Sequence, residues 1–229
     1  MHTATLRSGL RERNKLEKVR RIKQAASELF IEKGFDDATT REIAARADVG
    51  MGTLFLYADN KRDLLFLIAN DELAAIIDKA VGAFRTDKSV LKSLIGAFAP
   101  IYTYFGTQPA LSRITLREMT FYDSGRQAKR FHASRERLIG LLTRIIEAGQ
   151  GRGDITRAER AEFIGWIAFC IYQVELRRWL TSENPDLTSG IKRLERALKL
   201  YLAGAGTSKP GHVAGNHPGK RRRQITPVS

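Results

Sequence analysis

Residues 39–61, TTREIAARADVGMGTLFLYADNK, decide how the rest of this chain is interpreted. Thr39 precedes Glu42 by three residues, which is the spacing of a capping box, so we predict that a short helix begins there. Asp48 stands where that helix must turn into a second short helix, because Asp enters the left-handed backbone region more easily than most residues. Two compact helices joined by a tight turn, with the second held outward, would fit the major groove of B-DNA.

This stretch and the helix predicted before it resemble the helix-turn-helix of the TetR/AcrR family of transcriptional regulators. The resemblance covers roughly residues 15–70. The positions that agree with the family in register are Ile22, Ala25, Ala26, Leu29, Phe30, Gly34, Phe35, Thr39, Thr40, Ile43, Ala44, Ala47, Val49, Gly52, Thr53, Leu54, Phe55, Tyr57 and Lys61. The chain departs from the family pattern at Asp48, where a glycine is usual, at Gly50, where Ser or Thr is usual, and at Ala58, where an aromatic is common.

The resemblance implies a DNA-binding role for the second short helix and its surroundings. In such a complex that helix lies in the major groove, where Met51, Thr53 and Phe55 are the candidates for reading base edges. Phosphate contacts require donors at the rim of the groove. The candidate DNA-binding residues are Thr39, Thr40, Arg41, Gly50, Met51, Thr53, Phe55, Tyr57 and Lys61. Ordinary alternatives remain for three of them: Arg41 as an ion-pair partner within its helix, Tyr57 as a core aromatic, and Lys61 as a solvated lysine.

The composition favours a soluble all-α protein. The chain has 229 residues, of which 43% are hydrophobic, and only six prolines. No strand alternation or internal repeat occurs, and no signal peptide is recognised at the N-terminus. The longest apolar stretch, 163–174, is shorter than the run of about 18 residues that a membrane span needs. A single cysteine, Cys170, excludes an intrachain disulfide and fits a reducing cytoplasm.

Charge and side-chain chemistry favour a binding protein over an enzyme. The net charge is +14, but residues 1–80 are nearly neutral, so the motif supports DNA binding more strongly than the charge does. Three of the four histidines lie in the termini, and Cys170 sits in an apolar run typical of inert packing. We therefore expect no catalytic residues, no metal site and no cofactor.

The pattern along the chain predicts about nine helices in two bundles. Residues 1–13 are expected to be a flexible basic arm, and 14–62 a three-helix helix-turn-helix domain. Asn60 followed by Asp63 predicts a second capping box, which opens a long linking helix over 61–84. Residues 85–204 are expected to form a helical ligand-binding and dimerisation bundle, and 205–229 a disordered basic tail.

Two apolar stripes in the last two helices are candidates for a homodimer interface. Four such helices, two from each subunit, would form an intermolecular bundle. The candidate residues are Phe163, Trp166, Cys170, Val174, Ile191, Leu194, Leu198 and Tyr201. The alternative is that both stripes face only the core of their own domain, as any amphipathic helix does.

By resemblance to the family, the C-terminal bundle would bind a small molecule. The aromatic-rich helices supply the candidates for a large, mostly apolar pocket: Phe98, Tyr102, Phe105, Met119, Phe121, Tyr122, His132, Trp166 and Phe169. Each of them could instead belong to the core. The basic segment 126–137 is interpreted as a solvated face, with an anionic ligand or an acyl-carrier head group as the alternative.

Taken together, the sequence predicts a ligand-responsive transcriptional repressor that binds a palindromic operator as a dimer and is released by an apolar effector. The alternative is an architectural or effector-independent DNA-binding protein without a ligand pocket. An enzyme is the less favoured class, because no nucleophile paired with a base, metal cluster or phosphate loop occurs.

Overall fold

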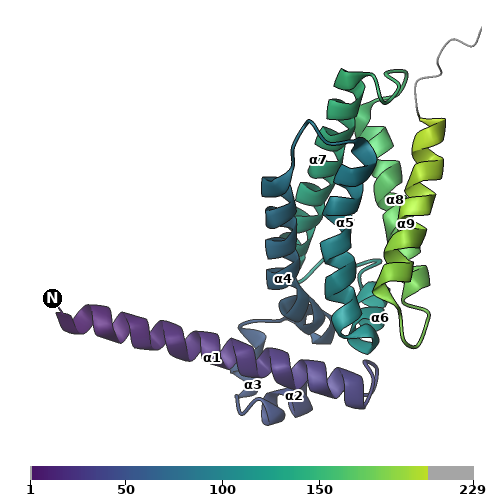
Figure 1. The fold of residues 1–229 in the computed structure, drawn as a ribbon. Coiled ribbons are helices and arrows are strands. Elements are labelled where there is room, and N and C mark those ends of the chain that lie inside the picture. The colour runs from purple at the N-terminus through teal and green to yellow at the C-terminus, as the bar shows by residue number, and fades with distance from the viewer. Residues whose placement is uncertain (1, 206–229) are drawn as a thin grey trace, which may run out of the picture.

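The computed structural model of the chain describes residues 2–205 and contains nine helices in that range. The predicted all-α fold is confirmed, with a small N-terminal domain below a larger helical bundle (Figure 1). The basic tail predicted from residue 205 onward lies, except for Ala205, outside the described residues. Within the described part of the chain, no helix is both long and apolar enough to cross a bilayer.

The N-terminal domain consists of α1 (His2–Glu32), α2 (Thr40–Arg46) and α3 (Met51–Phe55). These helices share one hydrophobic core, in which Ile22, Phe30, Ile43 and Leu54 are fully buried. The core exists because the apolar residues of α1 recur at helical spacing on the side that faces α2 and α4. The same core continues into the C-terminal bundle.

The first helix is longer than the sequence predicts. Residues 2–13, expected as a flexible arm, are helical and continue α1 without a break. The helix extends well beyond the rest of the domain (Figure 1). The physical reason is that residues 2–13 contain no proline, the residue that most strongly breaks a helix, and only one glycine. A helix that has already formed can therefore propagate through them toward the N-terminus.

The backbone around α2 and α3 follows the predicted caps and turn. The Thr39 hydroxyl accepts from the Glu42 N–H while the Glu42 carboxylate accepts from the Thr39 N–H, which is the complete capping box. Asp48 adopts a left-handed conformation with φ of 51°, as the turn requires. Gly50 caps α3 without a side-chain hydrogen bond.

The linking helix α4 (Lys61–Ala83) begins where predicted and ends one residue earlier. The Asn60 side chain caps it by accepting from the Asp63 N–H. The second half of the predicted capping box is wrong, because the Asp63 carboxylate accepts from the Asp59 N–H instead of the Asn60 N–H. Its remaining lone pairs bind donors from a distant part of the chain.

The C-terminal bundle contains α5 (Val90–Thr107), α6 (Pro109–Glu118), α7 (Ala128–Arg152), α8 (Ala161–Trp179) and α9 (Leu187–Gly204). Helix α4 passes from the N-terminal domain into this bundle and packs against α5 and α7 (Figure 1). Helices α7 and α8 form the most extensive helix pair, and α9 packs against α5 and α8. One helix, α4, thus belongs to both domains.

Candidate functional site

Helix α3 lies at the surface of the N-terminal domain, and only one of its faces packs against the domain core. Leu54 is fully buried against the domain core, as is Ala58 just after the helix. Met51 and Thr53 are half-buried, whereas Phe55 and its neighbour Leu56 are exposed. The face of α3 opposite Leu54 is therefore accessible, which is the geometry that a groove-reading helix needs. Leu56 was not among the sequence candidates.

The candidate phosphate-binding residues surround α3 but differ in whether their polar groups already have partners within the protein. The backbone N–H and the side-chain hydroxyl of Thr39 both form hydrogen bonds with Glu42 in the capping box. Arg41 is exposed and, among the described residues, forms no ion pair. The Lys61 ammonium donates to the Asp36 carbonyl at 2.8 Å and lies 4.7 Å from the centre of the Phe35 ring. Thr40 and Tyr57 are half-buried.

A buried carboxylate, Asp63, joins the two domains. Besides the Asp59 N–H at 2.9 Å, it accepts from the Arg126 N–H at 3.0 Å and the Gln127 N–H at 2.9 Å. The Tyr122 hydroxyl donates to it as well. Burial and this carboxylate raise the pKa of Tyr122 far above its ordinary value. The start of α4 is thereby fixed to the connection between α6 and α7.

The Gln127 side chain connects this junction to α3. Its Nε2 donates to the Tyr57 carbonyl at 2.9 Å, directly after α3. Its Oε1 accepts from Asn70 Nδ2 at 3.3 Å, and its carbonyl accepts from the same nitrogen at 3.1 Å. Asn70 in turn lines a cavity in the bundle. A continuous set of hydrogen bonds therefore runs from that cavity to the end of α3.

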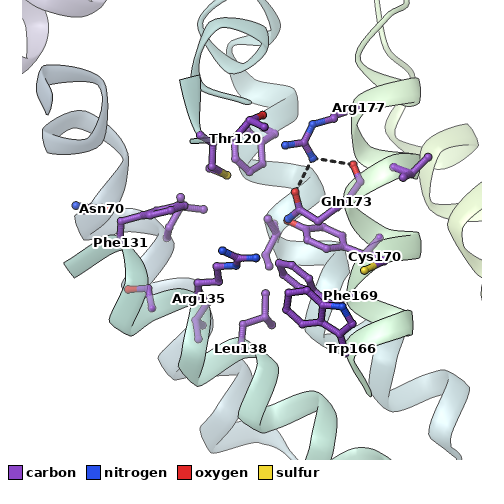
Figure 2. A pocket seen from close by; sticks show the side chains of 18 residues that line it. Asn70, Thr120, Phe131, Arg135, Leu138, Trp166, Phe169, Cys170, Gln173 and Arg177 are labelled. Atoms are coloured by element: carbon purple, nitrogen blue, oxygen red, sulfur yellow. Dashed lines mark hydrogen bonds between the residues drawn. The ribbon is translucent and has the colours of Figure 1, made fainter. Parts of the chain in front are cut away.

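The cavity lies between α4, α5, α7 and α8, with the end of α6 closing one side (Figure 2). Its volume is about 340 Å³, which is within the range of small-molecule sites. Most of the wall is apolar or aromatic. The wall includes Asn70, Leu73 and Ile77 of α4, Phe131, Arg135 and Leu138 of α7, and Trp166, Phe169, Cys170, Gln173, Val174 and Arg177 of α8.

Four of the nine candidate pocket residues line this cavity: Phe105, Met119, Trp166 and Phe169. The prediction that Phe98 and Tyr102 line the pocket is wrong, because both are fully buried in the bundle core, where Phe98 stacks on Tyr172. Tyr122 is also wrong, because its ring stacks on Phe66 in the core shared with the N-terminal domain.

Two further candidates lie away from the cavity. Phe121 is 80% exposed on the connection after α6. His132 is half-buried and lies beside the Phe131 ring, but only Phe131 reaches the cavity. Adjacent residues of a helix point in different directions, so His132 does not line the cavity although Phe131 does.

The basic segment over 126–137 does not behave as one solvated face. Arg126 pairs with Asp59 at 2.7 Å, Arg130 pairs with Asp71, and Arg137 pairs with Asp78 at 3.1 Å. Two of these acids belong to α4, so the arginines bind α7 to α4. Arg135 alone of the four arginines points into the cavity (Figure 2).

Sequence reasoning missed Arg135 and Arg177 as cavity residues, although the sequence carries a signal for the first. Phe131, Ser134, Arg135 and Leu138 recur at the spacing of one helical face, so Arg135 interrupts an apolar stripe. For Asp63 and Gln127 no local signal exists, because their partners come from distant segments.

The candidate dimer residues divide between surface and core. On α8, Phe163 is 53% and Val174 56% exposed, and Trp166 and Cys170 are also exposed. On α9, by contrast, Leu194 and Leu198 are fully buried in their own subunit, so these two predictions are wrong.

The remaining α9 candidates, Ile191 and Tyr201, are half-buried, and the Tyr201 hydroxyl donates to the Ile164 carbonyl of the same subunit. The reason is that α9 has one apolar stripe, and packing on α5 and α8 uses it.

Comparison with known proteins agrees with this geometry. Residues 22–68 match the family described as bacterial regulatory proteins, tetR family. The HTH-type transcriptional repressor KstR of Mycolicibacterium smegmatis is 25% identical over 189 residues, covering 81% of this chain and 87% of KstR. The HTH-type transcriptional regulator YvdT of Bacillus subtilis is 35% identical over 71 residues, and this match covers 31% of the chain and only 37% of YvdT.

Among solved structures, the fold is similar to that of the transcriptional regulator FadR from Bacillus subtilis in complex with stearoyl-CoA. The TM-score is 0.64 at 18% identity, over 81% of this chain and 98% of FadR. The same domain order, an N-terminal helix-turn-helix followed by a helical bundle, is therefore found in a known regulator. The match over 22–68 and the two curated relatives therefore show a tetR-family DNA-binding domain in the N-terminal part of the chain, and the chain as a whole is similar to bacterial transcriptional regulators.

Proposed function

We propose that the chain is a ligand-responsive repressor. It binds a palindromic operator as a homodimer through α3 of each subunit, and a small, mostly apolar effector in the cavity releases it. It would act in the cytoplasm, where its DNA is. The observation that carries this proposal is that α4 serves both sites. Its first turns share the core of α3, and its middle supplies Asn70, Leu73 and Ile77 to the cavity wall.

The proposed mechanism is a shift between two positions of α4. A ligand that fits the cavity better in one position increases the population of dimers in that position. The operator accepts only dimers whose two α3 helices are about 34–36 Å apart, or a multiple of that spacing. The hydrogen bonds from Asn70 through Gln127 to the Tyr57 carbonyl give this shift a direct connection to the end of α3. Release then requires no change in the base-reading residues.

Dimerisation is proposed to use the exposed face of α8. Phe163, Trp166, Cys170 and Val174 form an apolar strip there, and three of these four also line the cavity. A ligand in the cavity would therefore touch the helix that holds the partner subunit. This is a second way in which occupancy can change the distance between the two α3 helices.

The DNA-binding proposal is tested by selecting duplexes that the purified protein retains from a random pool. We expect a two-fold symmetric sequence, with affinity lost when Tyr57→Phe or Lys61→Ala removes a phosphate donor. Lys61→Ala should reduce the slope of log affinity against log salt by about one unit, because one phosphate contact disappears. An asymmetric or unspecific pool would favour the architectural alternative, as would operator affinity that no ligand alters.

The dimer is tested by measuring mass in solution for Phe163→Glu, which places a charge in the apolar strip without touching the cavity. We expect the dimer to dissociate at concentrations where the unmodified protein is fully dimeric. Phe121→Glu is the matched control, because Phe121 is an equally large and even more exposed side chain that belongs to the connection after α6 and not to α8. A dimer that survives Phe163→Glu and depends on Phe121 would place the interface elsewhere.

A further inference from the structure

The cavity contains two positive charges and no negative one. Among its described lining residues, Arg135 of α7 and Arg177 of α8 are the only ionised groups. Both point into the same space, from helices on opposite sides (Figure 2). The remaining wall is formed mainly by leucine, isoleucine and aromatic side chains. Charges in apolar surroundings are normally paired with an opposite charge, so this arrangement requires an explanation.

Arg135 has no acceptor for its five N–H donors within the described part of the chain. The neighbouring arginines of α7 pair with carboxylates, whereas the Arg135 guanidinium lies 5.5 Å from the Trp166 ring centre and 5.4 Å from that of Phe169. Stacking on rings holds the plane of a guanidinium but leaves its hydrogen-bond donors unused. Arg135 is thus positioned by aromatic contacts and open toward the cavity.

Arg177 has acceptors, but all of them are neutral. It donates to the Gln173 carbonyl at 3.0 Å, to Gln173 Oε1 at 2.5 Å and to the Leu116 carbonyl at 3.4 Å. Burial lowers the pKa of Arg177, which shows that its surroundings disfavour the charge. The nearby acid on α8, Glu175, is committed to Arg178 and Arg193, each at 3.1 Å. No carboxylate of the described protein therefore neutralises this pair of arginines.

We propose that the effector is an amphipathic anion, with an apolar chain or ring system on the apolar wall and an acidic head group at Arg135 and Arg177. This inference rests on the proposed function, since it names the ligand class of the same cavity. Planar guanidinium groups bind carboxylate and phosphate through paired hydrogen bonds, which a purely apolar ligand could not use. The head group can come from a free carboxylic acid or from the phosphates of a coenzyme A thioester, and both sources share this chemistry.

The test compares ligands that differ only in the head group. Dissociation constants are measured by calorimetry on the full-length protein for a series of n-alkanoates, the n-alkanols of equal length, their coenzyme A thioesters, and coenzyme A alone. We expect the best acid or thioester to bind at least about tenfold tighter than the matched alcohol, which corresponds to one charge-assisted interaction. Tighter binding of the acid assigns the carboxylate, and tighter binding of the thioester but not of coenzyme A alone assigns the thioester.

Variants at the arginines then separate charge from shape. Arg135→Met should weaken the anion about tenfold and change alcohol binding less than twofold, while Arg135→Lys restores part of the anion affinity. Arg137→Met is the matched control, because Arg137 lies on the same helix, pairs with Asp78 and does not line the cavity. The proposal is overturned if no anion binds more tightly than its alcohol, or if Arg135→Met weakens both classes equally.

The two proposals fail in different ways. An anion that binds through Arg135 but leaves operator affinity unchanged would support the ligand class and contradict the effector role. Neutral ligands that release the operator while no anion binds would support the effector role and contradict the ligand class. Operator release is measured in the same samples by fluorescence anisotropy of labelled DNA.

Discussion

Asp63 and Arg135 are both charged groups inside the protein, yet their surroundings are opposite. Asp63 is completely buried and accepts hydrogen bonds from three backbone N–H groups and the Tyr122 hydroxyl. Arg135 faces a cavity and has only ring contacts among the described residues. A charge with every partner supplied by its own chain holds a structure together. A charge without one is available for a ligand.

The two groups also occupy different positions relative to α4. Asp63 lies in its first turn and ties it to the α6–α7 connection, whereas Arg135 faces the cavity wall that the middle of α4 helps to form. The protein thus has a firm attachment near α3 and an unsaturated site further along the same helix. Under the proposed function, such an arrangement would let a ligand act on α4 without loosening the core around α3.

The largest effect is expected for Asp63→Ala. Removing the carboxylate leaves the Tyr122 hydroxyl and the Gln127 N–H buried without an acceptor. Loss of a buried charged acceptor with its donors intact costs about 3 to 5 kcal/mol in the free energy of unfolding. Urea denaturation at neutral pH measures this difference directly.

Asp71→Ala is the matched control for that experiment. Asp71 also lies on α4 and pairs with Lys23 at 2.5 Å and with Arg130, but its side chain is 51% exposed. Exposed ion pairs contribute about 0 to 1 kcal/mol. If Asp71→Ala destabilised the protein as much as Asp63→Ala does, burial and hydrogen bonding of Asp63 would not be the reason for its importance.

A smaller loss is expected for Gln127→Met, which keeps the length of the side chain and removes its polar atoms. The Tyr57 carbonyl loses a donor and Asn70 loses one of its two acceptors. The expected cost is about 1 to 2 kcal/mol in the free energy of unfolding, again by urea denaturation. If Gln127 transmits the cavity state, the ratio of operator dissociation constants with and without ligand should also fall, by an amount equivalent to about 0.5 to 2 kcal/mol. An unchanged ratio would leave Gln127 a purely structural residue.

The helix-turn-helix could be predicted from sequence because its determinants are local. The Thr39–Glu42 cap, the turn at Asp48 and the apolar spacing around Leu54 all lie within a short stretch of chain. Each of these signals acts between residues a few positions apart, so it can be recognised without knowing the rest of the fold. The long linking helix could be predicted for the same reason.

The junction and the cavity depend on contacts between distant segments. Asp63 has the spacing of a capping residue, but its partners Tyr122 and Gln127 lie 59 and 64 positions away. No local pattern distinguishes a carboxylate that caps its own helix from one that binds another.

The same limitation explains the errors on α7 and α9. Arg135 lies in sequence among arginines that pair with acids, so the sequence analysis interpreted all of them together as one basic face. Leu194 and Leu198 form a stripe that could face either a partner or the core. Only the packing of α9 on α5 and α8 decides between the two.

Arg135→Met is expected to leave the stability of the ligand-free protein almost unchanged. Contact with the Trp166 and Phe169 rings stabilises the guanidinium in the folded protein, whereas its partial removal from water destabilises it. Because these two contributions oppose each other, the change in the free energy of unfolding should stay within about 1 kcal/mol. The measurement is the same denaturation experiment without ligand. A loss larger than that of Gln127→Met would mean that Arg135 has its partners within the protein, and the contrast with Asp63 would disappear.

The smallest effect concerns Glu42, a third charged group, which has its hydrogen-bond partners but is only half-buried. It therefore shows what these partners contribute without full burial. The ion pair with Lys33 at 2.5 Å, then the Thr39 hydroxyl and N–H, lower the pKa of Glu42 from 4.5 to about 2. Because the folded-state pKa lies below the unfolded value, its contribution to stability is present above pH 4.5 and is lost as the pH falls toward 2. Glu42→Gln keeps a capping side chain but removes the charge. The two proteins should therefore differ slightly in unfolding free energy at pH 7, and the difference should shrink between pH 4.5 and the lowest pH at which both remain folded. A difference that is independent of pH would show that the shape of Glu42, and not its charge, supports the start of α2.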